Sequence, residues 1–193
     1  MFEVKSPSSE LCCQGSKLLS CQDITLNVDN MTQLELAEKV LFQDKVFNFI
    51  NDVEPNGRFF KSSDGDNIIF TINKKLGSLF GSIKTMDERS FGIEMCRNGY
   101  VLKEFDMDAF PQEITFSVNQ SLSSGSLKHA PGDERKDKVV TYSVMFYYTP
   151  QFAAITQDIA GYIDQVLAET NQGYINSNIP IRSKTPHIAQ CGI

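Results

Sequence analysis

The segment from Val140 to Lys184 constrains the fold of this chain most strongly, because the spacing of its apolar residues changes partway along it. Tyr142 to Tyr148 is a run of β-branched and aromatic residues, which is typical of a strand. After Thr149-Pro150 the apolar residues recur at helical spacing, at Ile155, Ile159, Ile163, Val166 and Leu167. Ile179-Pro180-Ile181 then begins a second extended segment. The segment predicts a β-α-β unit with one long amphipathic helix that ends near residues 176–178.

A unit of this kind connects two parallel strands by a right-handed crossover. Two parallel strands and one helix form a sheet that is too small to be stable alone. We therefore expect the unit to pack on the upstream strands, on a second copy of the chain, or on additional polypeptide.

The centre of the chain carries the strongest β pattern outside this unit. Asn67 to Asn73 alternates apolar side chains, and Leu79 to Ile83 follows it as a hairpin partner. Phe91 to Met95 and Tyr100 to Phe105 are two more short strands, and Asn98-Gly99 between them is a strong hairpin signal. The four strands predict an antiparallel meander.

Upstream of this meander the pattern is weaker. Lys17 to Val28 contains apolar residues that alternate as in a half-buried strand, and Lys39 to Phe42 favours a strand over a helix. Asn51 to Gly57 contains Pro55-Asn56-Gly57 and predicts a turn.

Together these elements predict an α+β protein, in which a β-rich antiparallel module precedes the β-α-β unit. Residues 121–138 are rich in Ser, Gly and charge and show no hydrophobic periodicity, which favours a linker. We expect a flexible leader at residues 1–16, the β-rich module at 17–120 and the β-α-β unit at 139–193.

Three pieces of the β-α-β segment carry a resemblance to a known family. They are the strand ending in Tyr147-Tyr148-Thr149-Pro150, the helix containing Ala168-Glu169-Thr170-Asn171-Gln172, and the passage from Tyr174 to Ile181. Here the chain resembles the start of the catalytic domain of reprolysin-like zinc metalloproteases of the metzincin class. More loosely, Ile93 to Pro111 resembles the end of the propeptide of such enzymes. The resemblance implies that the β-rich module is propeptide-like and that residues 139–193 are the N-terminal β-α-β portion of a metzincin-like catalytic domain.

Zinc metalloproteases of this class bind zinc through an HExxH motif, in which two histidines on one helical face are ligands and the glutamate is the general base. No HExxH motif occurs in this sequence, and its two histidines, His129 and His187, lie far apart. We therefore expect no catalytic residue, no metal ligand and no cofactor in this chain. Zinc would belong to a catalytic portion that the chain lacks.

Two functions are compatible with these features. The first is a non-catalytic, truncated relative of a secreted reprolysin-like zinc metalloprotease, which acts by binding a protease or another protein and can inhibit it. The second is the N-terminal, propeptide-containing fragment of a longer zinc metalloendopeptidase whose HExxH helix lies beyond Ile193. The expected partner is a protein, either a protease or a second copy of the chain. Ile155, Ile159, Ile163 and Val166 form the candidate partner-binding face of the helix.

Charge and hydropathy exclude other partner classes. The net charge is −6, and the basic residues near Glu134 to Lys138 are neutralised by adjacent acids, so nucleic acid is not an expected partner. No apolar stretch approaches the roughly 18 to 20 residues of a membrane span. The N-terminus shows no secretory signal, although the resemblance implies a secreted, extracellular protein.

The five cysteines, Cys12, Cys13, Cys21, Cys96 and Cys191, lie at spacings that match no CxxC metal or redox motif. They are either thiols or, in a secreted protein, one or two disulfides with one remaining thiol; the adjacent Cys12 and Cys13 are poor partners for each other. The resemblance adds another role, because a propeptide cysteine can bind the catalytic zinc and keep the enzyme latent. Cys96 is the candidate latency cysteine.

Three weaker motifs remain. Arg135 and Lys136 are a candidate processing site in the linker. Asn30 and Asn119 begin N-glycosylation sequons, which would be used in a eukaryotic secretory pathway. The acidic cluster at Ser63 to Asn67 lacks the oxygen spacing and terminal Glu of a calcium-binding EF-hand loop, so we expect a solvated turn there.

Overall fold

The computed structural model describes residues 2–8, 11–14, 17–26, 36–110 and 139–191. Within these residues nine strands form one antiparallel sheet, and two more strands pair in parallel. The large sheet contains β1 (Phe2–Pro7), β2 (Leu18–Leu26), β3 (Lys39–Phe42), β4 (Lys45–Val53), β5 (Gly57–Ser62), β6 (Asn67–Asn73), β7 (Ser78–Lys84), β8 (Ser90–Cys96) and β9 (Gly99–Phe105). The other elements are η1 (Leu11–Cys13), η2 (Met107–Ala109), β10 (Val140–Tyr148), α2 (Pro150–Ile155), α3 (Ile159–Asn176) and β11 (Ile181–Gln190). The expected α+β class, an antiparallel β-rich part followed by a β-α-β unit, is confirmed.

The large sheet is mostly a meander, in which strands β3 to β9 lie side by side in chain order. β2 pairs with β9, and β1 with β2, so the N-terminal strands extend the sheet beyond its last hairpin. The predicted β6–β7 and β8–β9 hairpins are both present. Gly99 in the second turn has a φ of +148°, a value that residues with a Cβ rarely adopt.

The sheet curls so that one of its faces encloses a core. The rings of Phe42 on β3 and Phe91 on β8 lie 6.1 Å apart, although four strands separate β3 from β8 in the sheet. Between them Phe49, Phe60 and Phe70 pack edge to face. This enclosed face is the main hydrophobic core.

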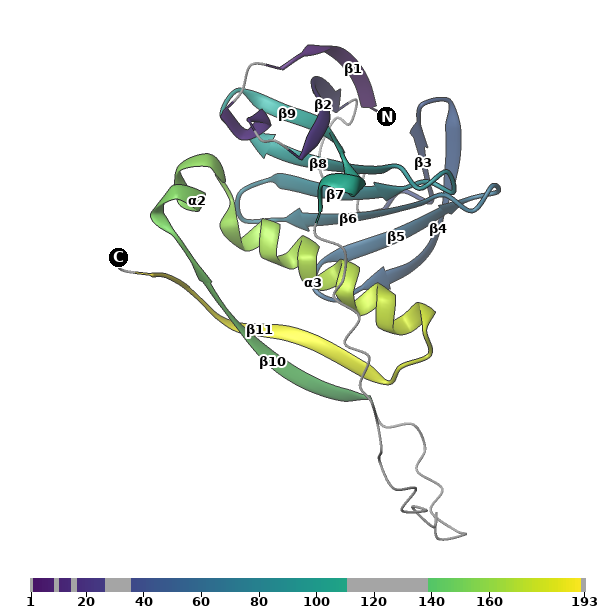
Figure 1. The fold of residues 1–193 in the computed structure, drawn as a ribbon. Coiled ribbons are helices and arrows are strands. Elements are labelled where there is room, and N and C mark those ends of the chain that lie inside the picture. Colours follow the sequence, from purple (N-terminus) through teal and green to yellow (C-terminus); the bar gives the residue numbers. More distant parts are fainter. Residues whose placement is uncertain (1, 9–10, 15–16, 27–35, 111–138, 192–193) are drawn as a thin grey trace, which may run out of the picture.

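Helix α3 covers the opposite face of the sheet and separates it from the β10–β11 pair (Figure 1). Ala168 of α3 packs among Val53, Phe59 and Ile69, which project from β4, β5 and β6. The β-α-β unit therefore packs on the upstream sheet, as one of the three expected arrangements requires. Both faces of β5 and β6 are consequently buried.

Two helices occupy the region for which one long helix is predicted. Thr149 caps α2, since its Oγ1 accepts the Phe152 N–H at 3.2 Å and Pro150 occupies the first turn. Asp158 caps α3 in the same way, accepting the Gly161 N–H at 2.9 Å. The polar residues between Ile155 and Ile159 therefore end one helix and begin the next. The end of α3 at Asn176 agrees with the predicted end.

Asn171 of α3 joins the two sheets through buried hydrogen bonds. Its Nδ2 donates to the C=O of Glu54 at 2.7 Å and to the C=O of Ser183 at 3.0 Å. Its Oδ1 accepts from the N–H of Ser183 at 2.7 Å and from its hydroxyl at 3.0 Å. Because Glu54 follows β4 and Ser183 lies on β11, one side chain ties the parallel pair and the large sheet to the same helix.

Three expectations are wrong in detail. Residues 1–16 contain strand β1 and two cysteines in disulfides, so the described part of this segment is not a flexible leader. Asn51 to Val53 belong to β4, and the turn is confined to residues 54–56. Strand β5 was not predicted, because Phe59 and Phe60 are both buried, on opposite faces, and this removes the alternation that marks a one-sided strand.

Candidate functional site

The four predicted partner-binding residues are not equivalent in the structure. Ile163 is only 4% exposed and packs within the fold, whereas Val166 is 37% exposed and Ile155 lies exposed at the end of α2. Ile159 is partly buried. Of the four, Val166 and Ile155 have the most surface available to another molecule.

A groove runs along α3, over the outer face of β7, β8 and β9; we call it the α3 groove. It encloses about 340 Å³, and its apolar lining comes from Phe80, Phe105, Met107, Phe110, Tyr162 and Val166. Tyr162 packs against Phe80 with 6.2 Å between ring centroids, and Phe105 against Phe110 at the same separation. Met107 is 52% exposed at one side of the groove. The floor of the groove thus consists of aromatic rings that pack against one another. The side of the groove at Met107 exposes apolar surface that a partner could cover.

Charged residues lie beside this apolar lining. Lys103 projects into the groove and forms an ion pair with Glu94 of the neighbouring strand. Burial lowers the pKa of Lys103 to about 8, so the ammonium remains largely protonated at neutral pH. Glu169 of α3 and Lys84 of β7 complete a mixed-charge border. An apolar centre with a charged border is typical of protein-binding surfaces.

A second cavity, the β10 pocket, lies between β10, α2 and α3 and encloses about 310 Å³. Phe146, Tyr148, Phe152 and Ile163 line it. Tyr162 and Val166 line both this pocket and the α3 groove, so the two meet at the N-terminal half of α3.

The cysteines form two disulfides, Cys12–Cys96 and Cys13–Cys21, and Cys191 is free. Of the two alternatives, thiols or one or two disulfides with one remaining thiol, the structure has the second, with two disulfides and no bond between the adjacent cysteines. Cys96 is buried, and its sulfur is bonded to Cys12. A latency role for Cys96 needs a thiolate, which exists only when this disulfide is reduced. The same holds for metal binding by the nearby group of Cys12, Glu94 and Cys96.

Several predicted sites lie outside the described residues. These are the processing site Arg135 and Lys136, the sequon residues Asn30 and Asn119, and His129. His187 lies on β11 opposite Met145, with its ring 6.4 Å from that of Tyr147.

The acidic cluster at Ser63 to Asn67 is a turn whose buried acid is already paired. The carboxylate of Asp66 accepts from Lys45 Nζ at 2.6 Å and from the Met86 N–H at 2.8 Å. The Lys45 hydrogen bond, aided by the Met86 N–H, lowers the pKa of Asp66 despite its burial. These bonds occupy the oxygens that a calcium ion would need.

Replacing Asp66 with Asn should lower the free energy of unfolding at pH 7 by about 1 kcal/mol, a modest value because Lys45 is half-exposed and water screens the pair. The folded-state pKa is depressed, so the stabilisation is complete above the unfolded-state pKa near ~4 and is lost as the pH falls through the folded-state value. Urea unfolding between pH 7 and pH 2 measures this. Asp64→Asn is the control, since the exposed Asp64 lies 3.6 Å from the same lysine and should change stability little. An Asp66→Asn loss that is independent of pH would contradict the assignment.

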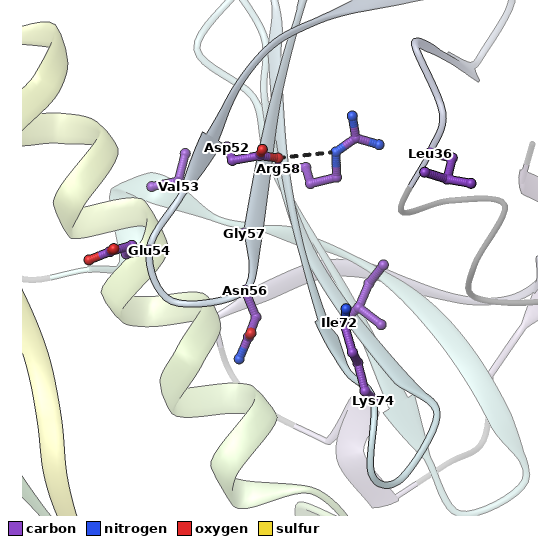
Figure 2. A pocket seen from close by; sticks show the side chains of 9 residues that line it. All are labelled: Leu36, Asp52, Val53, Glu54, Asn56, Gly57, Arg58, Ile72 and Lys74. Atoms are coloured by element: carbon purple, nitrogen blue, oxygen red, sulfur yellow. Dashed lines mark ion pairs between the residues drawn. The ribbon is translucent and has the colours of Figure 1, made fainter.

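An open cavity of about 530 Å³ lies beside the β4–β5 turn (Figure 2). Arg58 lies in it with its guanidinium 4.1 Å from the centroid of Phe49, and its Nε is 3.4 Å from the Asp52 carboxylate. Lys74 and Glu54 add one charge of each sign, and Glu54 points toward α3 in Figure 2.

Comparison with protein-family models, with curated proteins and with solved structures gave no match. The assignment of a function therefore depends on the geometry of the surfaces described above. No helix within the described ranges is long and apolar enough to cross a membrane.

Only part of the α3 groove can be predicted from the sequence. Val166 follows from helical spacing, but Phe80, Phe105, Met107 and Phe110 come from segments at least 50 residues away from it along the chain. The packing of α3 on the large sheet brings these segments together.

Proposed function

We propose that this chain is a non-catalytic relative of the reprolysin-like zinc metalloproteases and that it acts by binding a zinc endopeptidase of that class. Two features support a relative without catalytic activity. The order of parts, an antiparallel β-rich part followed by a β-α-β unit, is the order that the resemblance implies. The sequence contains no HExxH motif. The two disulfides support a site of action outside the cell, since disulfides persist in oxidising surroundings.

The α3 groove is the single observation on which the proposed binding function rests. Its apolar lining is exposed at Met107, Phe110 and Val166, and it is bordered by charges of both signs. A cavity of about 340 Å³ has room for a few side chains of a partner protein, which would bury this apolar surface. A binding surface of this kind needs no catalytic group.

One observation favours a second candidate, the N-terminal fragment of a longer zinc endopeptidase. Within the described residues the parallel sheet has two strands only, and β10 pairs along one side. Further strands of a catalytic domain would extend such a sheet. Reading the gene past Ile193 separates the candidates, since an in-frame HExxH supports the fragment.

The proposed function predicts that the purified chain binds no stoichiometric zinc and cleaves no casein, while it lowers the activity of a reprolysin-like zinc endopeptidase in a saturable manner. Elemental analysis and a casein assay with and without chelator test the first part. Titration of the chain into the endopeptidase assay tests the second. One zinc per chain together with chelator-sensitive cleavage of casein would contradict the proposal and indicate an enzyme. An endopeptidase rate that stays unchanged at a large molar excess of the chain would refute inhibition.

A further inference from the structure

Within the described residues, strand β10 pairs along one edge only, with β11. The N–H of Val140 donates to Pro180 at 2.8 Å, and the C=O groups of Val144 and Tyr148 accept from Thr185 and Cys191 at 3.2 and 2.8 Å. These three residues of β10 therefore direct their backbone groups toward β11. The extra residue of the irregularity in this pair lies on β11, so β10 itself stays regular.

The residues between them, Thr141, Ser143, Met145 and Tyr147, direct their N–H and C=O groups to the opposite edge, because backbone direction alternates along a strand. None of the described strands pairs with that edge. It presents a row of donors and acceptors along nine residues, the arrangement that another strand can extend.

The two outer edges of this small sheet differ in composition. β11 carries Arg182, Lys184 and Pro186, and charges and proline are residues that keep other strands from pairing. β10, with the sequence VTYSVMFYY, contains neither charge nor proline nor glycine. Only the β10 edge is therefore suited to strand addition.

The surface around β10 is also incompletely covered. None of its nine residues is buried, and Met145 is 61% exposed. Helix α3 packs on β11, which leaves the β10 pocket open beside Phe146 and Tyr148. An added strand would cover this pocket.

We propose that the strand added at this edge is β10 of a second copy of the chain, antiparallel to the first. A two-fold axis at Val144 places Thr141 opposite Tyr147 and Ser143 opposite Met145, so the outward-directed backbone groups of both copies pair. The result is a four-stranded sheet, which overcomes the small size of the two-stranded one.

Charge does not oppose a second copy at this edge. The chain carries a net charge of −6, which opposes self-association in general, but β10 is uncharged and brings no like charges together. Self-pairing also matches apolar and aromatic residues on the helix-facing side, where Tyr142 meets Phe146 and Val140 meets Tyr148. This dimer forms through the backbone edge of β10, whose pocket borders the α3 groove only at Tyr162 and Val166, and it does not rest on the proposed function.

Sedimentation of the full chain at tens of micromolar tests the dimer, with Met145→Lys as the disrupting variant and Met145→Leu as its control. The wild type and Met145→Leu should sediment with twice the 21.7 kDa mass of one chain. Met145→Lys should raise the dimer dissociation constant at least about tenfold, because each copy would bring a charge to the shared edge. A monomeric wild type overturns the proposal. Loss of the dimer with unchanged binding to the endopeptidase shows that the two surfaces are separate.

A crosslink tests the register in a way that does not depend on a disruptive variant. In a Cys191→Ser background, Val144→Cys should form a disulfide between the two copies under mild oxidation, because residues at the axis face each other at close range. Val46→Cys, at a more exposed position on β4, should not. A dimer that resists Met145→Lys and gives no Val144→Cys crosslink uses another surface and overturns the proposal.

Discussion

Removing the Cys12–Cys96 disulfide is expected to lower the free energy of unfolding by about 4 kcal/mol, the larger of the two disulfide effects in this chain. The bond joins residues 84 apart in sequence and ties η1 to β8. A crosslink that closes a long loop restricts the unfolded chain more than one that closes a short loop. The Cys13–Cys21 bond spans only 8 residues, and its removal should lower stability by roughly 2.5 kcal/mol.

The comparison uses Cys12→Ser/Cys96→Ser and Cys13→Ser/Cys21→Ser, each measured by urea unfolding. The two double variants remove the same number of sulfurs, so their difference isolates loop length and local packing. Equal losses, or a larger loss for the short loop, would show that restriction of the unfolded chain is not the main effect. A stable, folded Cys12→Ser/Cys96→Ser variant would also show that the fold tolerates loss of this disulfide, which a latency role for a reduced Cys96 requires.

Replacing Asn171 with Ala is expected to lower the free energy of unfolding by about 3 kcal/mol. The substitution leaves the buried Ser183 N–H without its hydrogen-bond partner, at about 1 to 3 kcal/mol, and it also removes the partly buried bond to the Glu54 C=O, at roughly 1 kcal/mol. Because Asn171 joins α3 to β11 and to the β4–β5 turn, the β10–β11 pair should also loosen. Hydrogen exchange of the β11 amides should rise more than that of β6.

Thr170→Ala is the matched control for Asn171→Ala. Thr170 is the preceding residue on α3, and its hydroxyl donates only within the helix, to the Val166 C=O at 2.9 Å. Its removal should change stability by less than about 0.5 kcal/mol. If Thr170→Ala and Asn171→Ala cost the same, the buried bonds of Asn171 would not be what holds the small sheet.

Local patterns predicted the elements that carry a sustained apolar pattern or a marked turn. Asn98-Gly99 identified the β8–β9 hairpin, and the change of apolar spacing after Pro150 identified the β-α-β unit. β5 escaped prediction because its only large apolar residues are the adjacent Phe59 and Phe60, which face opposite sides, Phe60 toward the core and Phe59 toward Ala168 of α3. β1 escaped because its short, polar sequence is held by pairing with β2 rather than by its own pattern.

For the candidate sites, too, local spacing predicted some residues and missed those that depend on tertiary packing. Helical spacing identified Val166, which lines the α3 groove, but it also selected Ile163, which packs within the fold. Spacing shows that a helix has an apolar face, whereas tertiary packing decides which part of that face is covered. The free edge of β10 could not be predicted, because it becomes evident only from the pairing of all described strands. The sequence of one strand carries no local signal for which neighbours it will have.

The central claim, a protein-binding function of the α3 groove, is tested most directly by the affinity of the chain for a reprolysin-like zinc endopeptidase. Isothermal titration should compare the wild type with Met107→Glu and Leu76→Glu. Both substitutions place an acid at an exposed apolar residue, but Leu76 lies in the β6–β7 turn, away from the groove. We predict saturable binding that Met107→Glu weakens at least about tenfold and Leu76→Glu leaves unchanged. No measurable binding by the wild type, or equal binding by all three proteins, would contradict the claim.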